Sequence, residues 1–150
     1  MPKVSLHNLP SYEGSNRVSD LLGTLGAFEG RSISAGFALV NLGANVETLA
    51  PGSASSHRHW HDRVDELVVV LDGVLTLIEE TGRLQLCAGD IGVFPAGDEN
   101  GHCLVNESAE SACFLVVASR HADDRCHYAE ADLIAESDGT LRRADGAIVS

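Results

Sequence analysis

Three histidines at alternate positions and a glutamate lie in the stretch His57-Arg58-His59-Trp60-His61-Asp62-Arg63-Val64-Asp65-Glu66. Successive side chains of an extended strand point to opposite faces, so His57, His59 and His61 would share one face. Alternating imidazoles beside a carboxylate such as Glu66 supply donors that bind a divalent transition metal. Three surface histidines on a polar loop would look similar, but the alternation, the glutamate and the apolar strand that follows favour a metal site.

The composition of the chain predicts one domain and excludes several kinds of partner. Its 150 residues suit a single domain, and a hydrophobic fraction of 44% is enough for one core. Ten basic residues against 22 acidic ones give a net charge of −12. An acidic surface repels phosphate backbones and anionic lipids, so we expect neither nucleic acid nor a membrane as a partner.

The cysteines and the N-terminal sequence predict a cytoplasmic protein. None of the four cysteines forms a CxxC pair, which argues against a zinc ribbon or a thioredoxin-like motif. Residues 1–10 have no basic segment followed by an apolar one, so no signal peptide is indicated. The longest apolar runs are too short to span a bilayer. A reducing cytoplasm with unpaired thiols is the expectation.

The pattern of strands and turns predicts an all-β barrel or sandwich within a single domain, 1–150. Asp72-Gly73 is a hairpin signal between two apolar runs, because both residues tolerate the positive φ of tight turns. Short strands separated by Gly, Asp and Pro turns are typical of barrels and sandwiches. We expect strands at 32–42, 66–71, 74–79, 84–86, 91–94, 102–106 and 111–119. The barrel core then spans about 32–119, with an N-terminal arm at 1–17 and a C-terminal arm at 120–150.

Two spaced motifs cover residues 51–106. The first contains Gly52, the HxH of His59 to His61, Glu66 after four further residues, and Gly73 after six more. The second contains Gly89, Pro95-Ala96-Gly97, His102 and Asn106. Together they resemble the two motifs of the cupin family. The RHWH string resembles in particular a subgroup of small single-domain cupins described as sugar-phosphate-isomerase-like.

The cupin resemblance implies a double-stranded β-helix, which is a jelly-roll barrel. It also implies a metal bound by the two histidines of the first motif, its glutamate and the histidine of the second motif: His59, His61, Glu66 and His102. Three neutral imidazoles and one carboxylate suit Zn, Mn, Fe or Ni better than Ca or Mg, which prefer oxygen ligands. The sequence does not choose among these metals.

Two alternatives concern the identity of the ligands. The register His57/His59 also gives an HxH, but only His59/His61 has the family's intervals to both Glu66 and Gly73. Asp65 is the alternative carboxylate, because a turn between His61 and Glu66 removes the strand parity that would separate the two acids. The family spacing favours Glu66.

The expected function is the binding or conversion of a small polar metabolite such as a sugar, a sugar phosphate or an organic acid. An isomerase is the first hypothesis, and a metal-dependent dioxygenase or a non-catalytic ligand-binding cupin are the alternatives. The sequence assigns no catalytic residue. Asp98, Glu99 and Asn100 can supply an acid or base or simply turn chemistry. His127 and Tyr128 can close the site from the C-terminal arm, although a surface position is the simpler expectation.

A homodimer is expected from the two arms and from the cupin resemblance. The arms 1–17 and 120–150 lack the apolar content to fold alone, so they would pack on a barrel. Trp60 alternates with His59 and His61, should point away from the metal, and is a candidate to meet such a covering arm. Removal of 121–150 should then weaken the dimer and leave metal binding by the four ligands largely intact, because they all lie within 59–102.

Overall fold

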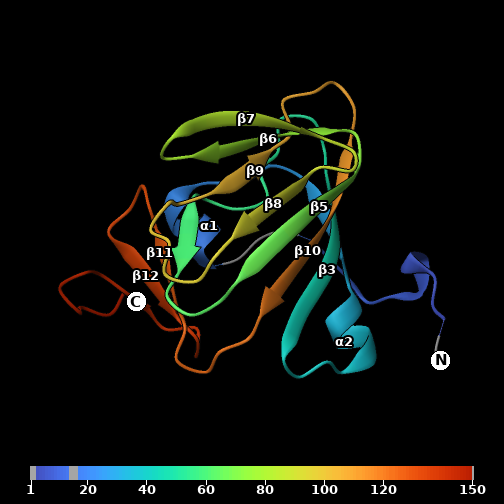
Figure 1. Ribbon diagram of the computed structural model, residues 1–150. Coiled ribbons are helices and arrows are strands. Elements are labelled where there is room, and N and C mark those ends of the chain that lie inside the picture. The colour runs from blue at the N-terminus through green and yellow to red at the C-terminus, as the bar shows by residue number, and fades with distance from the viewer. Residues whose placement is uncertain (1–2, 14–16, 150) are drawn as a thin grey trace.

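The structure is a computed structural model that describes residues 3–13 and 17–149 (Figure 1). Antiparallel strands form two facing walls of a jelly-roll barrel, which confirms the all-β fold class. The helical elements are short: the 3₁₀ turn η1 (Leu6–Asn8) and the helices α1 (Arg17–Leu22) and α2 (Ile33–Phe37). No helix in the described part of the chain is long and apolar enough to cross a bilayer.

One wall is a six-stranded sheet with the order β1-β2-β3-β10-β5-β8. Its strands are β1 (Ser11–Glu13), β2 (Phe28–Ser32), β3 (Leu42–Leu49), β10 (Ala112–Ser119), β5 (Glu66–Asp72) and β8 (Ile91–Phe94). Strand alternation places Glu66 and Val68 on the inner face, in register with Ala118 and Val116 of β10. The first carboxylate of the predicted site therefore projects into the barrel.

The opposite wall consists of two smaller sheets. One has the order β7-β6-β9, with β6 (Val74–Glu79), β7 (Gly82–Cys87) and β9 (Cys103–Val105). The other has the order β13-β12-β11-β4, with β4 (His59–His61), β11 (Arg125–Tyr128), β12 (Leu133–Glu136) and β13 (Leu141–Arg142). A pair of backbone hydrogen bonds between His59 and His102 joins the two sheets, with N···O distances of 3.1 and 2.9 Å.

The apolar core fills the closed end of the barrel. Its fully buried members include Leu49, Val70, Leu75 and Phe114, contributed by both walls. Burial of one such side chain contributes about 1.5–3 kcal/mol, so this cluster is the main source of stability. The core leaves the other end of the barrel for polar groups.

The turn predicted at Asp72-Gly73 is confirmed. It joins β5 of one wall to β6 of the other. Gly73 has φ +77°, and a Cβ there would lie 3.0 Å from Ala112. Glycine is therefore required both for the turn and for the close approach of β10.

The predicted strand at 32–42 is wrong. Ser32 ends β2 and its hydroxyl accepts a hydrogen bond from the Ala35 amide at 3.2 Å, which starts α2. The Ser34 hydroxyl then exchanges hydrogen bonds with the backbone of Ala44, fixing α2 beside β3. Capping and this tertiary contact override the strand propensity of the isolated apolar residues.

The C-terminal segment has more structure than the arm expected at 120–150. Strands β11, β12 and β13 continue the sheet from β4, and Figure 1 labels β11 and β12 of this sheet. Buried Leu133 and Leu141 pack with Val18 of α1 in a second apolar cluster. This segment therefore packs on its own barrel and forms part of the wall that carries the histidines.

Candidate metal centre

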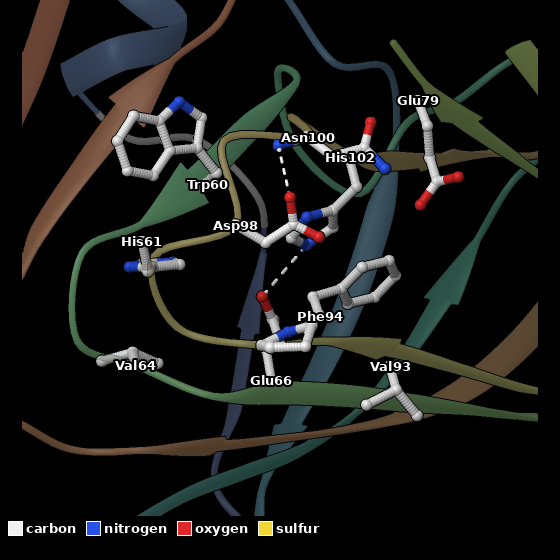
Figure 2. A pocket seen from close by; sticks show the side chains of 11 residues that line it. Trp60, His61, Val64, Glu66, Glu79, Val93, Phe94, Asp98, Asn100 and His102 are labelled. Atoms are coloured by element: carbon white, nitrogen blue, oxygen red, sulfur yellow. Dashed lines mark hydrogen bonds and ion pairs between the residues drawn. The ribbon is translucent and has the colours of Figure 1, made fainter. Parts of the chain in front are cut away.

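Three of the four predicted ligands converge at the open end of the barrel. The donor atoms of His59 on β4, Glu66 on β5 and His102 before β9 all lie within 4.8 Å of one another. Glu66 Oε2 lies 3.2 Å from His102 Nε2 and 3.7 Å from His59 Nε2. Figure 2 shows Glu66 reaching from its strand toward His102.

The geometry of this cluster suits a transition metal. Two donors that each lie about 2.0–2.2 Å from one ion are separated by about 3.0–3.5 Å in tetrahedral or octahedral coordination. The separation of 3.2 Å between His102 and Glu66 falls within that range, and the 3.7 Å between His59 and Glu66 is slightly wider. Two imidazoles and one carboxylate are also the donor types that such ions prefer.

Hydrogen bonds at Nδ1 orient the imidazole of His59. This atom lies 3.0 Å from the carbonyl oxygen of His57 and 3.1 Å from the hydroxyl of Ser56. Donation from Nδ1 to the His57 carbonyl leaves the lone pair on Nε2, the nitrogen that faces Glu66. The residues just before β4 therefore favour the tautomer that a metal requires.

His61 lies beside this cluster and is held by a carboxylate from the C-terminal segment. Its Nδ1 lies 2.7 Å from Asp124 Oδ2, while the other Asp124 oxygen accepts a hydrogen bond from the Arg63 amide at 2.9 Å. The ring centroids of His59 and His61 are 5.2 Å apart. A carboxylate at Nδ1 leaves Nε2 of His61 available as a donor, the arrangement common in metal-binding histidines.

A second group of potential ligands consists of His59, His61 and Cys126, which also lie within 4.8 Å of one another. Burial raises the pKa of the Cys126 thiol to about 12. Because the thiolate is the metal-binding form, a thiol that keeps its proton at neutral pH is a poor ligand. The cluster that contains Glu66 is the better metal site.

The protonation states of the buried donors suit metal binding. Burial opposes ionisation of Glu66, but the neighbouring imidazoles of His102 and His59 outweigh it and lower the pKa of the carboxyl. Burial lowers the pKa of His102, which favours the neutral imidazole. The ring of His102 also stacks on Phe94, with centroids 3.5 Å apart, so its plane is fixed by packing.

The two alternatives left open by the sequence lie elsewhere. His57 Nε2 lies 3.0 Å from the carbonyl oxygen of Gly23, away from the cluster of Glu66 and His102. Asp65 Oδ1 accepts a hydrogen bond from the Ala96 amide at 2.9 Å and so fixes the loop after β8. The structure thus brings the donor atoms of His59 and Glu66 together, and neither His57 nor Asp65 belongs to that donor cluster.

Trp60, His127 and Tyr128 lie around β4 and β11. Trp60 stacks on His127 with centroids 4.0 Å apart, and His127 Nε2 lies 2.9 Å from Asp62 Oδ1. Trp60 is therefore covered by its own C-terminal segment. The ring of Tyr128 lies 6.2 Å from that of His59. His127 and Tyr128 are consecutive residues of β11, so their side chains lie on opposite faces of the sheet.

The loop before His102 reaches the rim of the site. Asp98 and Asn100 line a pocket shared with Glu66 and His102 (Figure 2). Asp98 Oδ1 accepts from the Asn100 amide at 3.2 Å, and Asn100 Oδ1 accepts from the Glu80 amide at 3.0 Å. Both side chains therefore contribute to turn geometry as well as to the rim.

A cavity of about 250 Å³ extends from the cluster toward the core. His59, Glu66 and His102 line one part of it, and Asn45 and Glu47 of β3 line another. The sequence did not predict a role for Glu47, for Tyr12, whose hydroxyl donates a hydrogen bond to Glu47, or for Asp124, which contacts His61. Their spacing carries no motif, because each reaches the site through pairing of strands distant in the sequence.

The barrel and its His/Glu cluster define a class of small jelly-roll proteins, and comparisons with known proteins identify the family. The chain matches the cupin domain over residues 45–118. A solved cupin superfamily sugar phosphate isomerase from Silicibacter pomeroyi is 32% identical, with a TM-score of 0.87 over 99% of this chain and 97% of that one. The chain belongs to the cupin superfamily. No curated protein matches it.

Two further solved structures share the fold at lower identity. A proposed sugar phosphate isomerase from Acidithiobacillus ferrooxidans is 22% identical, with a TM-score of 0.78 over 95% of this chain and 86% of that one. The polyketide cyclase RemF from Streptomyces resistomycificus is 19% identical, with a TM-score of 0.62 over 79% of each chain. At these identities the likeness concerns the fold alone.

Proposed function

We propose that this cupin binds one divalent transition metal through His59, His61, Glu66 and His102, and isomerises a small polar carbonyl metabolite there. The observation that carries the proposal is the convergence of His59, Glu66 and His102 on the wall of a cavity. Zn, Mn, Fe and Ni all accept such donors, and availability would choose among them.

The residues of the proposed site have separate roles, which follow from the chemistry of the donor atoms. A bound ion would polarise a carbonyl and stabilise the oxyanion that forms from it. Ser56 and the His57 carbonyl hold His59 in the metal-binding tautomer, and Asp124 does the same for His61. Phe94 covers one face of His102 and limits the access of water on that side.

The proposed substrate class is a sugar or a sugar phosphate, with an organic acid as a further possibility. The cavity of about 250 Å³ has room for a small metabolite, and Asn45 and Glu47 offer polar groups to its hydroxyls. The solved relative with 32% identity is described as a sugar phosphate isomerase, which supports this class. Oxygen-dependent cleavage and simple ligand binding are the alternatives that an assay must separate.

The test begins with metal content. Untagged protein, purified without added metal, is analysed for bound elements and then loaded with Zn, Mn, Fe or Ni. We expect about one ion per chain, lost in His59→Ala and in His102→Ala and retained in the control His57→Ala. Equal metal content in all four proteins would refute the ligand assignment.

Activity is then measured on the loaded protein with the aldose phosphates of glyceraldehyde, ribose and glucose. Interconversion with the corresponding ketose is followed by NMR, and oxygen consumption is recorded in parallel with the Fe form. Isomer formation without oxygen uptake supports the proposal. Oxygen uptake would favour a dioxygenase, and binding without conversion would favour a ligand-binding protein.

We also propose a homodimer, with a different contact surface from the arms. On the outer face of this sheet, the residues in register across β5, β8 and β10 are apolar: Leu67, Val69, Ile91, Val93, Leu115 and Val117. Ile91 and Val93 on the edge strand are 61% and 64% exposed. A continuous apolar sheet face of this kind is stabilised by contact with a second copy. A cytoplasmic location stays a prediction, consistent with four free thiols.

A further inference from the structure

A tyrosine and a glutamate meet inside the barrel, outside the proposed metal shell. The Tyr12 hydroxyl donates a hydrogen bond of 2.7 Å to Glu47 Oε1. The two residues lie in one row across three strands, because Tyr12 pairs with Gly30 and Gly30 pairs with Glu47. The pair therefore connects the N-terminal strand β1 to the wall of the cavity.

Gly30 makes this contact possible. A Cβ at Gly30 would lie 2.1–2.5 Å from three atoms of the Tyr12 ring, far inside van der Waals contact. The ring consequently lies flat over the glycine and carries its hydroxyl one strand further, to Glu47. Tyr12 also makes an edge contact with Phe28, with centroids 6.4 Å apart, so its orientation is fixed on two sides.

Glu47 faces the cavity that contains the proposed metal ligands. It lies on the inner face of β3, two residues from Asn45, while the alternate residues Ala44 and Val46 are buried on the outer face. Among the described residues, Tyr12 supplies the side-chain hydrogen bond to this carboxyl. A molecule in the cavity would therefore lie between Glu47 and the cluster of His59, Glu66 and His102.

The surroundings of Glu47 favour exchange of a proton. Burial raises the pKa of Glu47, the hydrogen bond from Tyr12 lowers it, and the negative charge of Glu66 raises it further, with a net increase. The pKa of Tyr12 is raised mainly by burial, so the phenol stays protonated and remains a donor. The groups that face Glu47 are thus Tyr12 from β1 and Glu66 from β5. A carboxyl raised toward neutral pH is suited to acid/base work.

We propose that Glu47 is the acid/base residue of the cavity and that Tyr12 positions it for a substrate bound beside the metal ligands. This inference rests on the proposed isomerase function and assigns the proton transfer that it requires. The substrate class is a hydroxyaldehyde or hydroxyketone, in which a C–H bond lies next to a carbonyl.

The proposed step is balanced within the substrate and Glu47. The Glu47 carboxylate removes the proton from the hydroxyl-bearing carbon, and the electron pair of that C–H bond forms the C=C bond of an enediolate. The carbonyl π electrons move to oxygen. Glu47 then returns the proton to the former carbonyl carbon, while a proton passes between the two oxygens. The product is the isomer, and no oxidant or reductant is consumed.

The experiment measures exchange of the carbon-bound hydrogen for deuterium in D₂O, using the metal-loaded full-length protein and the three aldose phosphates above. Glu47→Gln keeps an oxygen that can accept the Tyr12 hydrogen bond but removes the base. We expect its exchange rate to fall by about 100-fold or more, with metal content unchanged. The matched control is Glu29→Gln, because Glu29 is exposed on the neighbouring strand β2 and pairs with Arg31.

The pH–rate profile of Tyr12→Phe distinguishes a residue that positions Glu47 from one that only stabilises the fold. Loss of the hydrogen bond that lowers the pKa of Glu47 should shift the acidic limb of the pH–rate profile, where the carboxylate takes up a proton, to higher pH. An unshifted profile would show that Tyr12 does not position Glu47.

Three other results would overturn the inference. Exchange by Glu47→Gln within about 3-fold of wild type would reject Glu47 as the base and leave the proposed function intact. Loss of metal in Glu47→Gln would make Glu47 part of the metal shell. Absence of exchange by the wild-type protein with every aldose phosphate would reject the isomerase function and, with it, this inference.

Discussion

Each imidazole on β4 has an oxygen partner that fixes which nitrogen can bind a metal. For His59 the partner is a local carbonyl two residues earlier, whereas for His61 it is Asp124, 63 residues away. The two histidines therefore depend on different parts of the chain. This difference makes the role of Asp124 testable without changing any proposed ligand.

Asp124→Ala should weaken metal binding by about 10–100-fold, because the imidazole of His61 loses the carboxylate that orients it and raises its basicity. Affinity is measured by competition with a chelator, for one metal at one pH. Asp123→Ala is the matched control, since Asp123 is exposed and its neighbour makes the contact with His61. Equal affinities for the two variants would contradict the assigned role.

Metal affinity should also depend on pH in a definite direction. Burial lowers the pKa of His102 below the ordinary histidine value of 6.5, so this imidazole stays neutral to lower pH than a free histidine. Protons compete with metal only for imidazoles that can be protonated. Metal affinity should therefore be constant above about pH 6.5 and fall at lower pH, where protons compete with the metal for His102.

Chelator competition from about pH 8 to about pH 5 measures this dependence. Affinity that stays constant to the acid end of the range would show that histidines are not the ligands. A fall that begins well above the ordinary histidine range would instead indicate a titrating thiol such as Cys126 among the ligands.

At the level of residues, the sequence identifies the proposed ligands more readily than the groups around them. The alternation along β4 and the intervals to Glu66 and His102 are fixed spacings in the sequence, so a sequence motif can describe them. The partnership of Tyr12 with Glu47 spans 35 residues and depends on Gly30 between them. No local pattern encodes it, because it arises only when three strands pair.

Among the elements, β4 and the strands between Glu66 and Ser119 were predictable from the sequence, whereas the strands of the C-terminal segment were not. The central strands alternate with clear turn signals such as Asp72-Gly73, and their interiors are apolar. The C-terminal strands are short and charged, and they form because β4 offers an unpaired edge. Their stability comes from pairing and from Leu133 and Leu141, which sequence periodicity does not reveal.

This arrangement reverses the expectation for removal of residues 121–150. Strand β11 pairs with β4 from Cys126↔His61 to Tyr128↔His59, and Asp124 holds His61. Deletion should therefore lower metal affinity by at least the 10–100-fold expected for Asp124→Ala, although all four proposed ligands remain in the chain. Metal titration of the truncated protein, with folding checked by circular dichroism, tests this. Unchanged affinity would show that β4 holds its ligands without β11.

On the scale of the whole molecule, charge and apolar surface have separate roles. A net charge of −12 keeps copies of the chain apart in general. Contact between two copies through the apolar outer face of β5, β8 and β10 opposes this repulsion. Self-association through that face should therefore strengthen as salt screens the charge.

Light scattering at micromolar concentration should give twice the chain mass of 15.8 kDa. Ile91→Lys should shift the mass toward the monomer, because the charge would be buried without a partner. Leu84→Lys is the control, since Leu84 is 60% exposed on β7 of the opposite wall. A monomer mass for the unmodified protein would rule the dimer out.

The stacking of Trp60 on His127 has an optical consequence. Trp60 is the only tryptophan of the chain, so the indole fluorescence arises from one side chain between His59 and His61. A paramagnetic ion such as Cu²⁺ or Mn²⁺ at the neighbouring imidazoles would quench this emission, whereas separation of β4 from β11 would expose the indole and shift its emission to longer wavelength. The native protein thus carries an internal probe that distinguishes filling of the site from opening of the wall that holds it.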